Sequence, residues 1–286
     1  MNLKSKIRIF STMLLVSMCL STSVIEAQET LTREEQQMRK RRQEDLRKQD
    51  LQKKRKITVE KPDLEAIRDK TLDPQSPYYF PKLLAKYNRN DTVMTNDEYR
   101  YFYLGYMFQE DYDPYRKSEY ADKTDLLRMK TSHTKDEMDT IRKYTELALL
   151  DNPFDLRQMS FLVKVLKEQK KFMTAKIWEY RLEHILGAIK STGTGEDIEN
   201  AWYVIYPAHE YDLIGLLGYS ATDADFIEPA FDYLTVVPNE DTKRRLRNKV
   251  PSGFYFNVEV PTEQYVLKHP EFAEDEIVAA DGEDDE

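Results

Sequence analysis

Cysteine is nearly absent from this sequence. Its 286 residues include a single cysteine, Cys19, which lies inside the apolar N-terminal run. A chain cleaved behind this run keeps no thiol, which excludes disulfides and cysteine-ligated metals from the mature fold. The alternative is lipidation of Cys19. It is disfavoured because Met18, directly before the cysteine, is not the small residue that bacterial lipidation signals require.

Glycine and long apolar runs are also scarce. The sequence has 8 glycines and 33% charged residues, a composition that favours helices over a turn-rich all-β fold. After residue 27, no segment approaches the roughly 20 apolar residues of a membrane-spanning helix. No transmembrane segment is therefore expected in the mature chain.

The first 27 residues have the order of a secretory signal peptide. Three basic residues (Lys4, Lys6 and Arg8) precede an uncharged run over residues 9–25, and Ala27 follows small and polar residues. This three-part order predicts cleavage after Ala27. We therefore expect an exported protein that is periplasmic, outer-membrane-associated or secreted.

The charges of the chain are unevenly distributed. Residues 28–61 predict a basic arm, helical or disordered, because their many charges come with few apolar residues. Residues 271–286 are strongly acidic and predict a disordered tail. The net charge of the whole chain is −9, and the body between arm and tail is acidic as well. An acidic body is a poor partner for nucleic acid, whose binding depends on neutralising phosphates.

The first part of the body, residues 62–190, reads as helical. Thr95 with Glu98 and Thr134 with Glu137 have the spacing of capping boxes, which begin helices. Apolar residues at helical spacing predict helices over residues 63–69, 82–87, 95–109, 134–150, 156–169 and 172–189. The stretch from Ala148 to Leu182 partly matches a tetratricopeptide repeat. One partial repeat cannot build a solenoid, so we expect antiparallel helix pairs.

The second part of the body, residues 191–270, contains strands. Its β-branched and aromatic runs predict strands over residues 202–206, 233–237 and 254–260. A short helix is expected over residues 211–217 and a turn over residues 238–241. The prediction is therefore one mostly helical α+β domain over residues 62–270, in which helix pairs precede a small C-terminal sheet.

Aromatic motifs in this body resemble a known family. They are Tyr78–Pro81, Glu98–Gln109, Gly193–Gly195, Tyr203–Ile205, His209–Tyr211, Phe231–Leu234 and Phe254–Val258. Together they resemble the secreted Bacteroidetes family known as domain of unknown function 4919, over roughly residues 62–265. The resemblance implies an exported single-domain protein, and it brings no activity, cofactor or catalytic residue with it.

A metal site is one candidate for chemistry. His209, Glu210 and Asp212 combine an imidazole with carboxylates, which are ligands of zinc and of harder cations. Adjacent residues point in different directions, and metal sites need three or four converging ligands. A polar loop that caps the helix over residues 211–217 is therefore the favoured interpretation.

A ligand platform is the second candidate. Tyr99, Tyr103 and Tyr106 share one face of a predicted helix, and exposed aromatic rings bind sugars and peptides. An aromatic stripe at helical spacing belongs more often to the core.

These observations favour a non-enzymatic exported protein without a cofactor that binds an unknown protein, peptide or glycan. One alternative is a hydrolase-like or metal-dependent enzyme that uses His209 and Glu210. The other is a glycan- or peptide-binding protein that uses exposed tyrosines.

Overall fold

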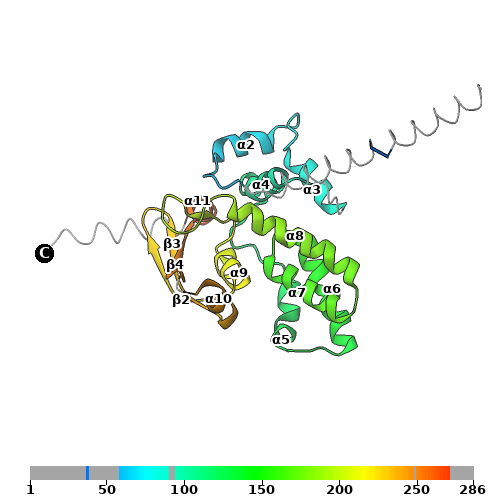
Figure 1. Cartoon of the computed structure of the whole chain (residues 1–286). Helices are drawn as coiled ribbons and strands as arrows, with labels where there is room; N and C mark the ends of the chain where they lie inside the picture. Colours follow the sequence, from blue (N-terminus) through cyan, green and yellow to red (C-terminus); the bar gives the residue numbers. More distant parts are fainter. Residues whose placement is uncertain (1–36, 39–57, 90–93, 248, 271–286) are drawn as a thin grey trace, which may run out of the picture. The chain divides into compact units, whose positions relative to one another are not determined.

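The structure is a computed structural model that describes residues 37–38, 58–89, 94–247 and 249–270 (Figure 1). The chain divides into two units, residues 1–56 and 57–286, and the elements below belong to the second. The predicted signal peptide, nearly all of the basic arm and the acidic tail lie outside the described residues. The second unit begins before the predicted boundary at residue 62, and the backbone N–H of Glu60 donates to the carbonyl of Ser191 at 2.9 Å.

Three helices open the fold. They are α2 (Leu64–Leu72), α3 (Phe80–Asn88) and α4 (Asn96–Gly105), and α4 continues as the 3-10 turn η1 (Tyr106–Phe108). The side chain of Asp63 accepts from the backbone of Ala66 at the start of α2. The capping box of Thr95 and Glu98 forms as predicted at the start of α4. These side chains thus bond free N–H groups at the starts of α2 and α4. Helix α3 has no side-chain cap and carries Pro81 in its first turn.

A helical stack follows two short turns, η2 (Ala121–Thr124) and α5 (Asp125–Arg128). Its helices are α6 (Lys135–Asp151), α7 (Leu156–Glu168) and α8 (Phe172–Lys190). Consecutive helices pack against each other, and α8 also packs on α4 (Figure 1). The second capping box, Thr134 with Glu137, begins α6 as predicted.

The C-terminal part forms a four-stranded sheet in the order β1-β4-β3-β2. The strands are β1 (Trp202–Tyr203), β2 (Tyr219–Ile227), β3 (Phe231–Pro238) and β4 (Gly253–Asn257). Only β1 and β4 pair in parallel; the other pairs are antiparallel. One face of the sheet shares its core with the helices, because Leu234, Phe254 and Phe256 belong to the same buried cluster as Phe102 and Ile185. The predicted α+β, mostly helical class is confirmed.

The predicted strand over residues 202–206 is too long. Only Trp202 and Tyr203 pair with β4. The next three residues are buried without a strand partner. The backbone of Ile205 bonds instead to two tyrosine hydroxyls, from Tyr103 and Tyr112. Side chains thus replace the ladder that the β-branched run predicts.

Three further expectations differ from the structure. The predicted strand over residues 254–260 ends at Asn257, where helix α11 (Glu259–Lys268) follows. The predicted turn over residues 238–241 leads into helix α10 (Glu240–Leu246), capped by the Asn239 side chain. Strand β2 was not predicted, because this edge strand is polar and largely exposed and shows little apolar alternation.

Candidate functional site

Helix α9 (Ala208–Leu217) carries the proposed metal ligands, and it begins earlier than predicted. Pro207 stands at the N-cap, and Gly218 ends the helix with a left-handed φ of 89°, a conformation that favours glycine. The prediction of a polar capping loop is wrong, since His209 and Glu210 lie in the first helical turn and each is only 2% exposed. Helix α9 contacts β2 and α7 (Figure 1).

Both ring nitrogens of His209 are hydrogen-bonded. Nε2 lies 2.9 Å from the carbonyl oxygen of Phe154, and Nδ1 lies 2.7 Å from the hydroxyl of Tyr103. A carbonyl only accepts, so Nε2 carries the proton and Nδ1 accepts from Tyr103. The Tyr103 oxygen in turn accepts the backbone N–H of Ile205 at 3.2 Å. When the imidazole is neutral, both ring nitrogens of His209 and the hydroxyl of Tyr103 have hydrogen-bond partners.

The electrostatics agree with this proton assignment. Burial lowers the pKa of His209 to about 3, while the bond to the Phe154 carbonyl opposes the shift and Arg157 adds to it. The ring is therefore neutral at pH 7. The ring joins three parts of the fold: helix α4, helix α9 and the turn that precedes α7. A neutral imidazole with both nitrogens bonded to protein atoms has none left for a metal or a substrate proton.

A second buried tyrosine also bonds to the backbone of Ile205. The hydroxyl of Tyr112 donates to the Ile205 carbonyl at 2.5 Å, on the other side of the residue from Tyr103. Burial raises the pKa of both tyrosines, so their hydroxyls stay protonated. These two side chains fix the segment that leads into α9.

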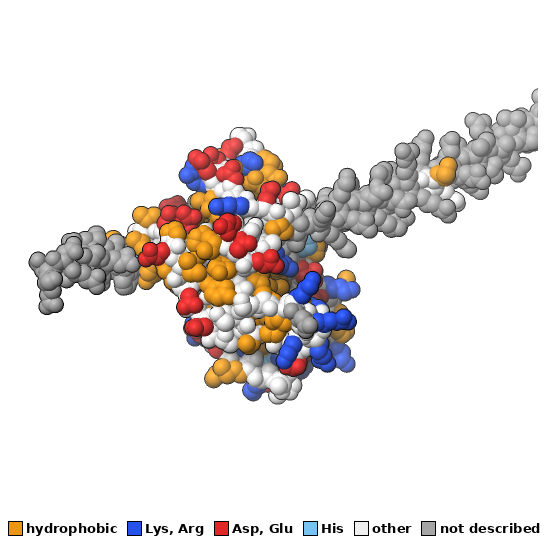
Figure 2. All heavy atoms as spheres, turned by 60° about the vertical axis from the view of Figure 1, so that its left-hand side comes forward, with side chains coloured by type: hydrophobic (Ala, Val, Ile, Leu, Met, Phe, Trp, Pro, Cys, Tyr) orange, Lys and Arg blue, Asp and Glu red, His pale blue; other side chains and the backbone are white. Residues whose placement is uncertain are grey.

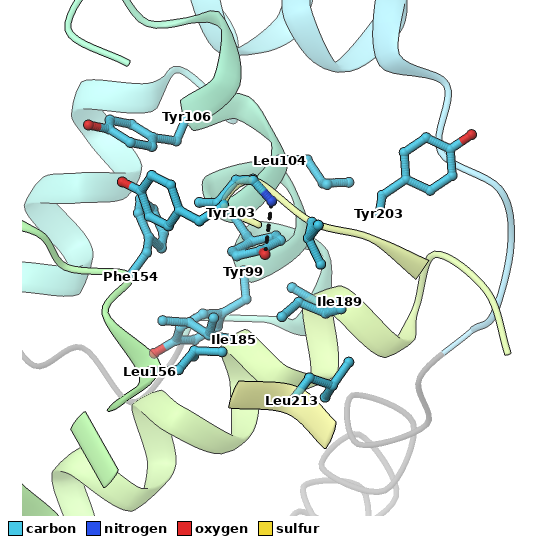
Figure 3. Close-up of a cluster of buried hydrophobic side chains, with 14 of the residues drawn as sticks. Tyr99, Tyr103, Leu104, Tyr106, Phe154, Leu156, Ile185, Ile189, Tyr203 and Leu213 are labelled. Carbon is cyan, nitrogen blue, oxygen red and sulfur yellow. Dashed lines mark hydrogen bonds between the residues drawn. The ribbon is translucent and has the colours of Figure 1, made fainter. Parts of the chain in front are cut away.

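The three tyrosines of the predicted ligand platform lie in the core (Figure 3). Tyr99, Tyr103 and Tyr106 are 2%, 0% and 5% exposed. Their rings pack against other aromatic side chains, among them Phe154 and His184. A stacking platform needs an exposed ring face, and none of the three provides one in this structure. The stripe serves packing here.

Glu210 points toward the sheet and meets another carboxyl group. Its side chain hydrogen-bonds to Asp232 of β3, while its Oε1 has no partner among the described residues. Burial raises the pKa of Glu210 to about 9, and the charge of Asp232 adds to the shift. Burial raises the pKa of Asp232 as well. A buried carboxyl group and a partly buried one in contact cannot both ionise cheaply, so the pair keeps one proton at neutral pH.

Asp212 bonds in a third direction, to Arg157 of α7 at 2.8 Å. The three side chains of the metal alternative therefore have three separate sets of partners: tyrosine and carbonyl for His209, Asp232 for Glu210, and Arg157 for Asp212. Over the described ranges, no group of three or more His, Cys, Asp or Glu side chains could hold a metal ion. The metal alternative does not have converging ligands.

A pocket of about 250 Å³ lies beside α9, between α7 and the segment over residues 114–128. Four carboxylates and four cations line it: Asp122, Asp125, Asp155, Asp212, Arg116, Lys117, Arg128 and Arg157. His209 and Gln158 also contribute to the lining. Gln158 is 2% exposed; its Nε2 donates to the carbonyl of Ala121 at 3.2 Å, and its buried Oε1 has no partner among the residues that the structure describes. The pocket thus combines a charge-balanced lining with a buried, unused acceptor.

Sequence reasoning missed Asp232, Arg157 and Gln158. Asp232 lies in the run Phe231–Leu234 and is the one ionisable side chain on the inward-facing alternation of β3, which continues with the buried Leu234 and Val236. That break in the apolar pattern was a usable signal. Arg157 and Gln158 sit in the first turn of α7, and nothing in the linear sequence connects them with α9.

Comparisons with known proteins give one match. A family model described as Domain of unknown function (DUF4919) matches residues 65–266. No curated protein and no solved structure matches this chain. In the part of the chain that the structure covers, no helix has both the length and the apolar composition to cross a membrane.

Proposed function

We propose that this chain, which belongs to the family described as Domain of unknown function (DUF4919), is an exported protein that binds a peptide segment of a partner without converting it. The site is the pocket beside α9 that Gln158, Arg157 and Asp212 help to line. Its charge-balanced lining with an unused buried acceptor is the observation that carries the proposal.

The lining suits a ligand that brings both charge signs and hydrogen-bond donors. Four positive and four negative groups cancel, so the pocket does not select a strongly charged ligand of one sign. An unsatisfied buried acceptor costs about 1–3 kcal/mol, which a donor from the ligand recovers. A peptide backbone offers N–H donors for Gln158, and its charged side chains can pair with the lining.

The polar groups of α9 support binding over catalysis. His209 reaches the pocket lining, but its two nitrogens are held by Tyr103 and Phe154. Glu210 is bonded to Asp232 and is not among the residues that line the pocket. His209 and Glu210, the two residues of the enzyme alternative, therefore have different surroundings and do not line one pocket together.

Export rests on the basic start, apolar run and Ala27 of the first 27 residues, and the family resemblance implies a Bacteroidetes source. Mass spectrometry of protein recovered from an expressing bacterium should find an N-terminus near Gln28 without lipid. A lipid on Cys19 would replace the free protein with an anchored one, and an intact N-terminus would contradict cleavage.

Peptide selection tests the binding site. Short random peptides are selected on the purified mature chain, and their affinities are measured by calorimetry. The substitution Gln158→Leu removes the unused acceptor and should weaken the selected peptides about tenfold. Gln169→Leu is the matched control. Gln169 also lies at an end of α7 and donates from Nε2 to Asp139, and its buried Oε1 has no partner in the described part of the chain.

Each outcome decides the proposal. Selected peptides that lose affinity on Gln158→Leu and keep it on Gln169→Leu support the site. A selection that yields no binding peptide contradicts the proposal, as do peptides that bind both variants equally. Peptides whose mass changes during incubation would show conversion, and the non-enzymatic assignment would then be abandoned.

A further inference from the structure

The outward face of the sheet carries two adjacent tyrosines. Tyr233 of β3 and Tyr255 of β4 are direct cross-strand partners. Their ring centroids lie 4.6 Å apart, with the rings tilted by 45°. The neighbours Leu234, Phe254 and Phe256 are buried, so strand alternation places both tyrosines on the opposite face. Both are partly exposed, unlike the core tyrosines of α4.

Gly253 allows the ring of Tyr233 to lie close to β4. A Cβ atom at this position would lie 2.4 Å from Cζ of Tyr233 and 2.6 Å from the carbonyl oxygen of Leu234. Any other residue would displace the ring. The hydroxyl of Tyr233 also lies 3.1 Å from Oγ of Ser252. The ring is therefore held in one position, which lowers the entropy lost when a ligand stacks on it.

A hollow of about 560 Å³ adjoins these rings. Its walls combine the two tyrosines with Pro251 and the polar residues Glu196, Lys249 and Ser252. Figure 2, which brings the sheet side of Figure 1 forward, shows a broad patch of hydrophobic side chains on this part of the molecule with acidic groups beside it. The volume lies within the range of small-molecule sites, which pair apolar walls with a few polar groups.

The turn that carries Glu196 is fixed beside β4. The backbone N–H of Tyr255 donates to the carbonyl of Gly195 at 2.9 Å. Gly195 has a φ of 71°, and a Cβ there would meet the ring of Trp202 at 2.8 Å. Only glycine fits this conformation and this contact. The Gly-Thr-Gly turn thus has a role: it sets the carboxylate of Glu196 at the rim of the hollow.

We propose that this hollow binds a carbohydrate ring, stacked on Tyr255 and Tyr233 and hydrogen-bonded by Glu196, Lys249 and Ser252. A pyranose has an apolar C–H face that packs on an aromatic ring and hydroxyls that both donate and accept. The Glu196 carboxylate accepts from such hydroxyls, the Lys249 ammonium donates to them, and Ser252 does either. Neither Glu196 nor Lys249 is in an ion pair within the described parts of the chain. One uncharged, hydroxyl-rich ring therefore meets all of these groups.

Calorimetry on the mature chain tests the proposal. The probes are neutral oligosaccharides of glucose, mannose, galactose and xylose, titrated to millimolar concentration. At least one should bind. Tyr255→Ala should weaken it about tenfold or more, because the stacking face is lost, while Tyr255→Phe keeps the ring and should stay within about threefold of wild type.

Further variants keep the test independent of folding and of the peptide site. Glu196→Gln changes an exposed turn residue and should weaken the sugar several-fold without altering the melting temperature. Tyr144→Ala removes a partly exposed tyrosine of α6 outside the hollow, and Gln158→Leu alters the other pocket. Both should bind the sugar as wild type does.

Three results would overturn the carbohydrate assignment. The first is that no oligosaccharide binds. The second is a sugar whose affinity ignores both Tyr255→Ala and Glu196→Gln. The third is a proline-rich peptide that binds these tyrosines while the sugars do not, since aromatic surfaces also accept polyproline helices.

Discussion

His209 and Glu210 are neighbours on α9, equally buried, and yet they have opposite surroundings. The imidazole has a hydrogen-bond partner for each nitrogen. The carboxyl group meets another acid and leaves one oxygen without a partner. Burial favours the neutral form in both cases, so it lowers the pKa of the base and raises that of the acid.

The comparison shows that burial alone does not determine what a polar residue contributes to stability. A fully bonded neutral network joins elements at modest desolvation cost, whereas a carboxyl group with an unsatisfied oxygen carries a penalty. The His209 network connects α4, α9 and the turn that precedes α7, and it acts as a fixed joint. The Glu210–Asp232 pair connects α9 to the sheet only while it holds a proton.

Removing the fully hydrogen-bonded side chain, His209, should change the stability most. His209→Ala leaves a cavity and deprives both the Tyr103 hydroxyl and the Phe154 carbonyl of their partner. We expect a loss of about 3–5 kcal/mol in the free energy of unfolding at pH 7, measured by urea denaturation. The milder Tyr103→Phe removes only the hydroxyl and should cost about 1–3 kcal/mol. A loss below 1 kcal/mol for His209→Ala would show that the network is not a joint.

Replacing Glu210, the carboxyl group with an unsatisfied oxygen, should stabilise the protein at high pH. The folded chain keeps a proton on Glu210 up to about pH 9, while the unfolded chain releases it near its ordinary pKa of about 4.5. The folded state therefore binds more protons between these values, so the stability that Glu210 contributes is greatest below pH 4.5 and is lost as the pH rises toward 9. Glu210→Gln removes this titration and provides an amide donor for Asp232. At pH 8 we expect the free energy of unfolding of Glu210→Gln to exceed that of wild type by about 2–4 kcal/mol.

The pH profile separates this explanation from a general packing effect. Wild type and Glu210→Gln should differ least near pH 4.5 and diverge as the pH rises. Asp232→Asn, which removes the other carboxyl group, should reduce the alkaline slope only in part, because burial is the main cause of the raised pKa of Glu210. Parallel profiles for wild type and Glu210→Gln would mean that the pair does not hold a proton in the folded chain.

The pH dependence of stability below pH 6.5 should depend on His209. His209 has a folded pKa of about 3 against an ordinary value of 6.5, so the unfolded state binds more protons between these values. The stability that His209 contributes is then fully present above pH 6.5 and is lost as the pH drops toward 3. Between pH 6.5 and 5 the loss from this residue should be about 1–2 kcal/mol. His209→Gln should show a shallower acidic slope in thermal unfolding, and an unchanged slope would contradict a neutral buried histidine.

Local signals explain what the sequence predicted well. The capping boxes at Thr95 and Thr134 and the proline at residue 153 sit at helix ends, where nearby side chains decide the structure. Apolar spacing placed α7 and α8 within a residue of their observed ends. These features depend on residues a few positions apart, so one sequence contains them.

The site depends on contacts between distant segments, and these were not predictable. Ile205 looks like strand because its neighbours are β-branched or aromatic, but Tyr103 and Tyr112, about 100 and 90 residues earlier, take its backbone bonds. His209 looks like a solvated helix start until Phe154 and Tyr103 are placed around it. Only tertiary structure shows that it is a core residue.

Asp212, whose side chain is 14% exposed and bonds to Arg157, should give the smallest effect. Its carboxylate pairs with Arg157 at 2.8 Å, but the Arg157 side chain is 47% exposed, and ion pairs open to water contribute under about 1 kcal/mol. Burial raises the pKa of Asp212, and Arg157 and Arg128 oppose the shift, so part of the attraction offsets desolvation. Asp212→Asn keeps an oxygen that accepts from Arg157. We expect it to change the free energy of unfolding by less than about 1 kcal/mol at pH 7, with a smaller dependence on salt than wild type. A loss above about 2 kcal/mol would show that the charge of Asp212 is as integral to the fold as His209, and the contrast between the faces of α9 would then fail.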